Sequence, residues 1–289
     1  MAKHEKAKTG QGILWIAAAN FDSWMRSPRT LLMFLFIMAI CYLQMCGYKM
    51  TLDATGYAVH YGETMFYEFN FGCNMPMTTA LFLVMVSELP RKIPFQQYAL
   101  VRSSRWRWAA AQILYCFMMV AAMLLLIFLF ISIFSLPLLT QGSGWSDTLR
   151  LAQGLIEPEQ ALIEEYIRSQ FTPLQALALA VIPMFCFWFV MVLVILFCGI
   201  WGKPVLGVLL YAFIMYAHVT IYFEFFPIPL SMPMHFSKLT SIVAGCEGEE
   251  VNELLRVIGG YVVLLAGMIM AILASAKRVE LKYYAENKM

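Results

Sequence analysis

The sequence predicts an all-α, polytopic membrane protein with six transmembrane helices in a single domain, residues 1–289. Three observations predict this class. The chain is 61% hydrophobic and 13% charged, with a mean hydropathy of +0.71, whereas a soluble domain is usually about a quarter charged. Six apolar runs are each long enough to cross a bilayer core of about 30 Å as a helix. Lys and Arg are also concentrated in alternate connecting segments.

Residues 12–26 are expected to form an amphipathic helix in the membrane interface, before the first apolar run. This segment, GILWIAAANFDSWMR, is followed by Ser27 and Pro28, which redirect the chain into the membrane. Asn20 is expected to face away from the apolar side. The alternative is that the segment is only the irregular start of the first span. The residues expected on the apolar face or in the headgroup layer are Leu14, Trp15, Ala17, Phe21, Trp24 and Arg26.

The six apolar runs contain no Asp, Glu, Lys or Arg in their cores. Carriers driven by protons or sodium usually keep ionisable residues at membrane depth, so this pattern disfavours an ion-driven carrier. His218 is an exception, and it is more typical of a satisfied polar residue near a helix end than of a proton relay. The third run is long and is expected to extend beyond the lipid. The predicted spans are 30–48, 70–88, 106–136, 173–199, 204–223 and 257–276.

Charge predicts the orientation of these spans. One set of segments holds 15 Lys and Arg against 5 Asp and Glu, namely 1–29, 87–107, 200–203 and 277–289. The other set holds 5 Lys and Arg against 13 Asp and Glu, namely 49–69, 137–172 and 224–256. Positive residues stay on the cytoplasmic side of a membrane. The sequence therefore predicts that both termini lie in the cytosol.

The stretch SELPRKIPFQQYALVRSSRWRW, residues 87–108, combines five Lys and Arg with prolines and aromatic residues, and it contains the predicted cytoplasmic coupling segment 88–104. Pro94 can begin a short helix, and Ser103 or Ser104 can cap the third span. An apolar knob with a basic rim is typical of a protein-docking element. Alternatively, orientation and interfacial anchoring alone explain the composition. The residues expected to dock a partner are Arg91, Lys92, Phe95, Gln96, Tyr98 and Arg102.

The outer segments are acidic, and one of them is apolar and broken. Residues 158–170 are expected to be helical, with Pro158 at the first position. The segment after the fifth span has prolines at 227, 229 and 233, which forbid a continuous helix. It is expected to dip into the outer leaflet and fold back, as a broken hairpin before the last span.

Motifs for catalysis and nucleotide binding are absent from the sequence. It contains no G-x-x-x-x-G-K-[ST], H-E-x-x-H or G-x-S-x-G pattern, so the chain is not expected to be an enzyme or to bind a cofactor or metal itself. The basic N-terminus is not followed by a cleavage pattern, and no cleaved signal is expected. Among the seven cysteines, three lie near the predicted outer face and could form one disulfide: Cys46, Cys73 and Cys246.

The order of these elements resembles the membrane subunit of type-2 ATP-binding-cassette (ABC) transporters. That family has a six-span permease with an elbow helix, a coupling helix between spans two and three, and short outer re-entrant helices before span six. The matching stretches are ILWIAAANFDSWMRSPRT, SELPRKIPFQQYALVRSSRWRW and FFPIPLSMPMHFSKLTSIVAG. The resemblance covers nearly the whole chain in layout, although its motifs are loose. The 36-residue outer segment 137–172 is longer than the family layout suggests.

The resemblance implies a permease subunit of an ABC exporter in a bacterial cell membrane. Two copies, or this chain and a related permease, would form the pathway above separate ATPase subunits that bind ATP and Mg²⁺. Phe95 and Tyr98 would enter a groove on the ATPase, and the elbow helix would brace that interface. The 21 Met and 22 Phe favour a hydrophobic or amphipathic cargo such as a peptide, bacteriocin or drug. The alternatives are a lipid or glycan exporter, a non-transporting scaffold or sensor partner, and a membrane-embedded enzyme acting on lipid.

Overall fold

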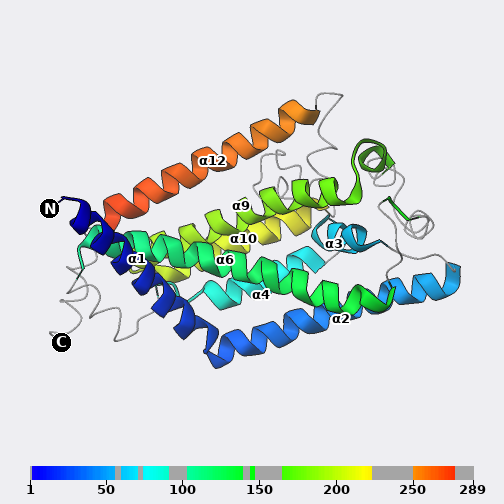
Figure 1. Cartoon of the computed structure of the whole chain (residues 1–289), viewed down its shortest axis with the longest axis horizontal. Coiled ribbons are helices and arrows are strands. Elements are labelled where there is room, and N and C mark those ends of the chain that lie inside the picture. The colour runs from blue at the N-terminus through cyan, green and yellow to red at the C-terminus, as the bar shows by residue number, and fades with distance from the viewer. Residues whose placement is uncertain are drawn as a thin grey trace.

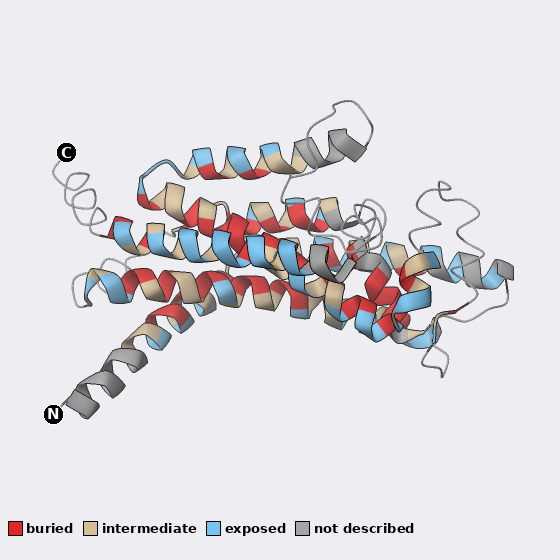
Figure 2. Cartoon of the chain, turned by 90° about the horizontal axis from the view of Figure 1, so that it is seen from above, coloured by how far each residue is buried: buried red, intermediate tan, exposed pale blue. Residues whose placement is uncertain are grey.

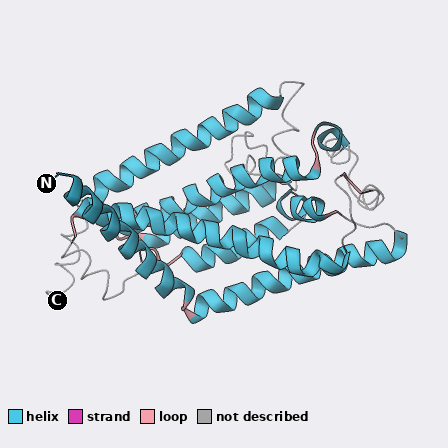
Figure 3. Cartoon of the chain, viewed as in Figure 1, coloured by secondary structure: helices cyan, strands magenta, loops and turns pink. Residues whose placement is uncertain are grey.

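All regular secondary structure in the described part of the chain is helical, which confirms the predicted all-α class (Figure 3). Most of the helices run along the long axis of the molecule, and α3 lies across it (Figure 1). The structure, a computed structural model, describes residues 2–55, 60–70, 74–90, 103–138, 144–146, 165–222 and 250–276.

The helices follow the predicted apolar runs closely in the second half of the chain and less closely in the first. Their bounds are α1 (Ala2–Met25), α2 (Pro28–Thr55), α3 (Tyr61–Asn70), α4 (Asn74–Val86), α6 (Arg105–Ser135), α9 (Pro173–Ile200), α10 (Pro204–Tyr222) and α12 (Glu250–Ser275). A short 3₁₀ turn, η1 (Leu136–Leu138), follows α6.

Four described helices contain a stretch that is long and apolar enough to cross a membrane, in α2, α6, α9 and α12. These stretches give the chain the character of a membrane protein. The corresponding stretches of α4 and α10 are shorter, Pro76–Val86 and Pro204–Met215. A helix rises about 1.5 Å per residue, so α4 by itself is shorter than a bilayer core. The six predicted crossings therefore remain a prediction.

Two predicted boundaries were wrong. The first helix begins at Ala2, not near residue 12, because Ala, Lys and Glu are good helix formers and extend a helix without needing lipid. The predicted run 70–88 contains two helix ends, since α3 stops at Asn70 and α4 starts at Asn74. The last helix begins at Glu250 with polar residues, and its apolar stretch, Leu255–Ser275, agrees with the predicted span 257–276. Hydropathy reports the apolar part of a helix and not its full length.

Helix α9 forms the centre of the bundle. It packs against α12, α10, α3 and α6, and 67% of its most apolar stretch is buried, against 11% for that of α12. Figure 2 shows buried residues gathered where the helices face one another. Its start is well defined. The Thr172 hydroxyl accepts a hydrogen bond from the Gln175 backbone N–H, and the Gln175 side chain accepts one from the Thr172 backbone N–H. This capping box satisfies two donors at a helix start.

A buried polar contact joins α9 to α4 and α10 within the apolar part of the bundle. The Trp188 Nε1–H donates to Thr79 Oγ1 at 3.1 Å, and the Tyr211 hydroxyl donates to the Thr79 backbone oxygen at 3.5 Å. All three side chains are buried. Phe82, one turn along α4, packs on Trp188 with ring centroids 5.2 Å apart. The three helices therefore share one packed and hydrogen-bonded seam.

Thr79→Val should destabilise this seam, because valine keeps the shape of threonine but leaves the Trp188 indole N–H without its acceptor. Hydrogen bonds between membrane helices contribute about 0.6 to 2 kcal/mol, and a loss of that size in unfolding free energy is expected. Thermal unfolding in detergent measures it. Trp188→Phe already removes the indole N–H, so adding Thr79→Val to that variant should lower the unfolding free energy by little more. If Thr79→Val costs as much in the Trp188→Phe background as it does alone, the hydrogen bond is not the cause of the loss.

Helix ends that charge assigns to one side of the membrane do lie together in the structure. The Trp201 Nε1–H at the end of α9 donates to Ser275 Oγ at the end of α12, at 3.3 Å. The Trp24 Nε1–H at the end of α1 donates to the Met85 backbone oxygen at the end of α4, at 3.4 Å. We call this end of the bundle the inner end and the opposite one the outer end. That the inner end faces the cytosol stays a prediction from charge.

Candidate functional site

The inner end of α4 is tied to the start of α2 by charge. The Arg29 guanidinium donates to Glu88 Oε1 at 2.6 Å and to Ser87 Oγ at 2.9 Å. Both charged side chains are partly exposed, and such pairs contribute only about 0 to 1 kcal/mol. These contacts therefore matter more for the position of the chain than for its stability. They fix the direction in which the chain leaves α4, directly before the basic segment.

The next two residues are held against α9. Leu89 is buried, and the Leu89–Pro90 backbone lies on Gly199 near the end of α9. A Cβ added at Gly199 would overlap the Leu89 carbonyl oxygen and the Pro90 ring. Only glycine allows backbone to approach this closely. The entry to the basic segment is therefore attached to the central helix of the bundle.

The exit from the basic segment is also attached, at the start of α6. The Ser104 hydroxyl accepts a hydrogen bond from the Arg107 backbone N–H at 3.4 Å, which confirms the predicted serine cap. Trp108 is fully buried, whereas Trp106 is exposed. Trp108 thus packs into the bundle, and Trp106 is free to lie at a membrane interface beside the start of α6.

The predicted docking residues themselves lie outside the described residues, which end at Pro90 and resume at Ser103. The structure therefore describes both ends of the basic segment, and its docking role and contacts stay a prediction. The residues concerned are Arg91, Lys92, Phe95, Gln96, Tyr98 and Arg102. The predicted outer hairpin after α10, with its three prolines, also lies outside the described residues.

Helix α1 packs on α6, and its buried face differs from the predicted one. Ile16, Ala17, Asn20 and Trp24 are buried, whereas Leu14 is 61% exposed. Asn20 was expected to face away from the apolar side, and this was wrong, because α6 covers a face of α1 that includes residues 16 and 20. Helical periodicity shows that a helix has faces, but a polar residue such as Asn20 can be buried where it meets another helix.

The other predicted elbow residues also divide between buried and exposed positions. Trp24 was expected in the headgroup layer but lies in the protein core, with its ring against Phe21 and Phe34 at centroid distances of 5.6 and 6.0 Å. Trp15 is 59% exposed, as an interfacial anchor requires. Arg26 forms an exposed pair with Asp22 at 3.0 Å. The role of α1 as an elbow helix stays a prediction.

A buried carboxylate at the outer end was missed by the sequence analysis. Glu63 on α3 is fully buried, and its two oxygens accept from the Ser146 backbone N–H at 3.2 and 3.1 Å. Its Oε2 also accepts from the His60 backbone N–H at 3.4 Å. The Glu63 side chain reaches back to the His60 N–H as the glutamate of a capping box does, but position 60 lacks the Ser, Thr, Asp or Asn that marks a helix start in a sequence. The sequence also contained no sign of the burial, which depends on residues 144–146.

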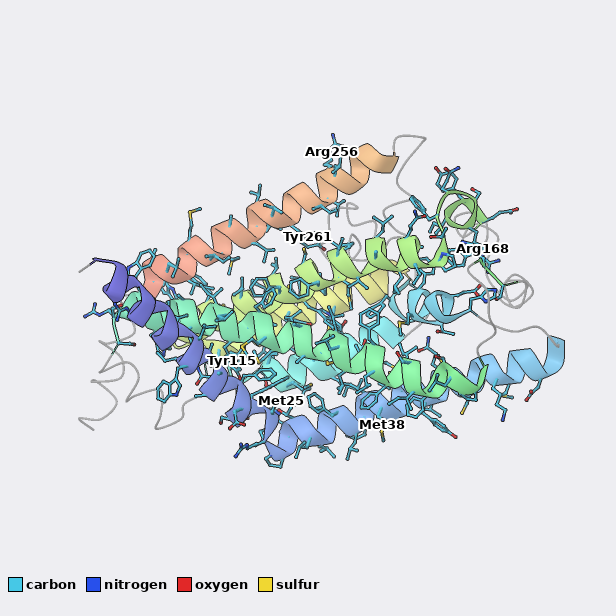
Figure 4. The ribbon with its side chains drawn as sticks, viewed as in Figure 1. Met25, Met38, Tyr115, Arg168, Arg256 and Tyr261 are labelled. Carbon is cyan, nitrogen blue, oxygen red and sulfur yellow. The ribbon has the colours of Figure 1, made fainter. Side chains whose placement is uncertain are left out.

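Arg168 is the cation closest to this carboxylate in the described structure, with Nη2 at 3.6 Å from Glu63 Oε1. Its guanidinium also stacks over the Trp145 ring, 5.5 Å from the centroid. Burial raises the pKa of the Glu63 carboxyl above its ordinary value, although the hydrogen bonds from Ser146 and His60 and the charge of Arg168 act in the opposite direction. Figure 4 shows Arg168 at the outer end beside α3.

The described residues of these two sites do not bring together the ligands of a metal. Among the described residues there is no group of three or more His, Cys, Asp and Glu side chains close enough to hold an ion. Cys46, a candidate for the predicted outer disulfide, is a free thiol, and its two candidate partners lie outside the described ranges.

Comparison with known proteins adds no relative. No family model, curated protein or solved structure matches the chain.

Proposed function

We propose that this chain is the transmembrane permease subunit of an ABC exporter, driven by separate ATPase subunits. The observation that carries the proposal is the attachment of the basic segment at both ends. Arg29, Leu89 and Gly199 hold its entry, and Ser104 and the buried Trp108 hold its exit. A segment whose two ends are packed on the helices can pass a displacement of a docked partner to those helices. A loop without such contacts would move by itself and leave the helices in place.

Six crossings are part of the proposal. The four long apolar helices provide four of them, and α4 and α10 provide the two short ones. In this arrangement both termini and the basic segment are cytoplasmic. ATP-dependent movement of the partner subunits would then shift α4 and α6, between which the segment lies, and α9, against which its entry packs. A displacement of packed helices about an interface is a common way to change access to a pathway.

The proposed cargo is hydrophobic or amphipathic, such as a peptide, bacteriocin or drug. The described parts of α4, α9 and α10 carry no charged side chain, and the chain is rich in methionine and phenylalanine. Methionine side chains adapt to varied apolar partners. An uncharged pathway disfavours a strongly anionic cargo because its desolvation would be uncompensated.

Co-expression with an ABC-type ATPase encoded beside the gene tests the proposal. A complex should survive detergent extraction and hydrolyse ATP, and Phe95→Ala with Tyr98→Ala should weaken it. An aromatic anchor in an interface pocket contributes about 2 kcal/mol or more, so affinity should fall about tenfold or more. Leu125→Ala, at an exposed position of α6 away from the inner end, is the matched control and should leave the complex unchanged.

Two results would count against this function. If the double variant binds and activates the ATPase like the unsubstituted chain, the docking residues are wrong. If the purified chain alone moves cargo into liposomes under an ion gradient, the exporter itself is wrong. A chain that binds a membrane partner but never an ATPase would support the scaffold alternative instead.

A further inference from the structure

The outer end carries two short stretches of chain that are joined to each other. We call residues 144–146 and 165–172 together the outer strap. The Trp145 Nε1–H donates to the Phe171 backbone oxygen at 2.7 Å, and the Arg168 guanidinium lies over the Trp145 ring. The two stretches therefore behave as one unit, although eighteen residues separate Ser146 from Glu165 in the sequence.

Glu63 is the point where this strap is attached to α3. Its carboxylate accepts the Ser146 N–H from one stretch and lies 3.6 Å from Arg168 of the other. Phe66, one turn along α3, supports the same contact with its ring edge-on to Trp145 at 5.4 Å. A Cβ added at Gly62 would lie 3.3 Å from the backbone carbonyl carbon of Pro173, so α3 and the start of α9 are in close contact there. Since the strap leads directly into α9 at that proline, α3, the strap and α9 meet at Glu63.

Among the described residues, few charges face Glu63. Helices α4 and α9, which pack on α3, carry no charged residue, and those of α6 lie in its first turn at the inner end. From the strap, Arg168 faces the carboxylate, while Glu165 is exposed. His60 precedes α3 and is half-buried. Within the described residues, burial therefore disfavours the ionised form of Glu63, and the hydrogen bonds and the Arg168 guanidinium favour it.

We propose that Glu63 is a proton-responsive latch that holds the outer strap on α3, closed when the carboxyl is protonated and released more readily when it ionises. In the closed state the group is fully buried, which disfavours its charge. In an open state it would meet water and recover its ordinary acidity. A state that binds a proton more tightly is favoured by acid, so acidification favours closure.

The pH window follows from the direction of that shift. Below the ordinary carboxyl pKa both states are protonated, and closure is at its strongest. As pH rises from that value toward the raised value of the closed state, the open state ionises first and gains population. Each unit of difference between the two pKa values changes the ratio of closed to open molecules by about tenfold. Above the raised value the ratio becomes constant again.

Hydrogen–deuterium exchange of the Ser146 amide, in the full chain in lipid nanodiscs without any ATPase, tests the latch. Protection relative to the intrinsic exchange rate should fall as pH rises from mildly acidic to neutral. Glu63→Gln should keep high protection and lose the pH dependence. Arg168→Gln should steepen the fall, because the remaining charge is then buried without its cation. Glu165→Gln, an exposed control on the same strap, should behave like the unsubstituted chain.

The latch is overturned by either of two results. One is protection that is constant or rises with pH in the unsubstituted chain. The other is an unchanged pH dependence in Glu63→Gln, which would assign the proton to another group. If Glu63→Gln does not fold, the Arg168→Gln variant still tests the latch. A fall of Ser146 protection with pH that is equally steep in Arg168→Gln and in the unsubstituted chain would refute the proposed role of Glu63 and its contact with Arg168. Because no ATPase takes part, failure here leaves the proposed exporter untouched, and failure of the docking test leaves the latch untouched.

Discussion

Trp24→Ala is expected to lower the unfolding free energy by about 3 to 5 kcal/mol, as truncation of a large buried aromatic side chain usually does. Trp24 is 1% exposed and joins three helices at the inner end. Its indole N–H donates to the Met85 oxygen of α4, and its ring packs on Phe34 of α2. Alanine would leave a cavity and remove both contacts. Thermal unfolding of the purified chain in detergent measures the loss.

Trp15→Ala is the matched control, since it removes the same side chain from the same helix at an exposed position. Its effect on unfolding should be small, within about 0.5 kcal/mol, as for most surface substitutions. Equal losses in the two variants would contradict the position of α1 on the bundle. A Trp15 effect seen only in lipid, and not in detergent, would instead support its role as an interfacial anchor.

Gly199→Ala should destabilise the inner end through steric overlap. The added methyl group would meet the Leu89 carbonyl oxygen and the Pro90 ring, neither of which can rotate away. Overpacking of this kind costs about 1 to 3 kcal/mol, and here it also displaces the entry to the basic segment. A lower unfolding temperature is therefore expected, together with weaker binding of an ATPase partner if the proposed function holds.

Gly267→Ala on α12 is the control for that substitution. No atom lies within 4 Å of its added Cβ, and alanine is the better helix former, so a gain of about 0.5 to 1 kcal/mol is expected. If Gly199→Ala is as stable as Gly267→Ala, the Leu89–Pro90 backbone does not lie on α9. Both variants are measured by the same thermal unfolding, so the comparison is direct.

Several features at the helix ends followed from local sequence. Ser27 and Pro28 separate α1 from α2, with the Thr30 backbone N–H donating to Ser27 Oγ at 3.3 Å. Ser104 caps α6 as expected. These signals depend on residues three or four positions apart, which is the range over which a helix end satisfies its own N–H groups.

Features that involve distant residues could not be predicted in this way. Trp24 was placed at the interface because tryptophan often lies there, but α2 and α4 enclose it. Tyr261, on the side of α12 that faces α9 in Figure 4, is buried although most of α12 is exposed. Which side of an apolar helix meets protein and which meets lipid leaves little trace in hydropathy, because lipid is as apolar as a protein core.

By itself the sequence determined that this chain forms apolar helices, where several of them begin, and that its positive charge gathers at one set of helix ends. Only the tertiary structure decided that a glycine on α9 admits the backbone leaving α4, and that Glu63 is enclosed by Ser146 and Arg168, 83 and 105 positions away in the chain. The physical reason is the sequence distance over which each interaction acts. Helix formation and membrane partitioning depend on neighbouring residues, whereas burial of a charge depends on which distant segments come to surround it.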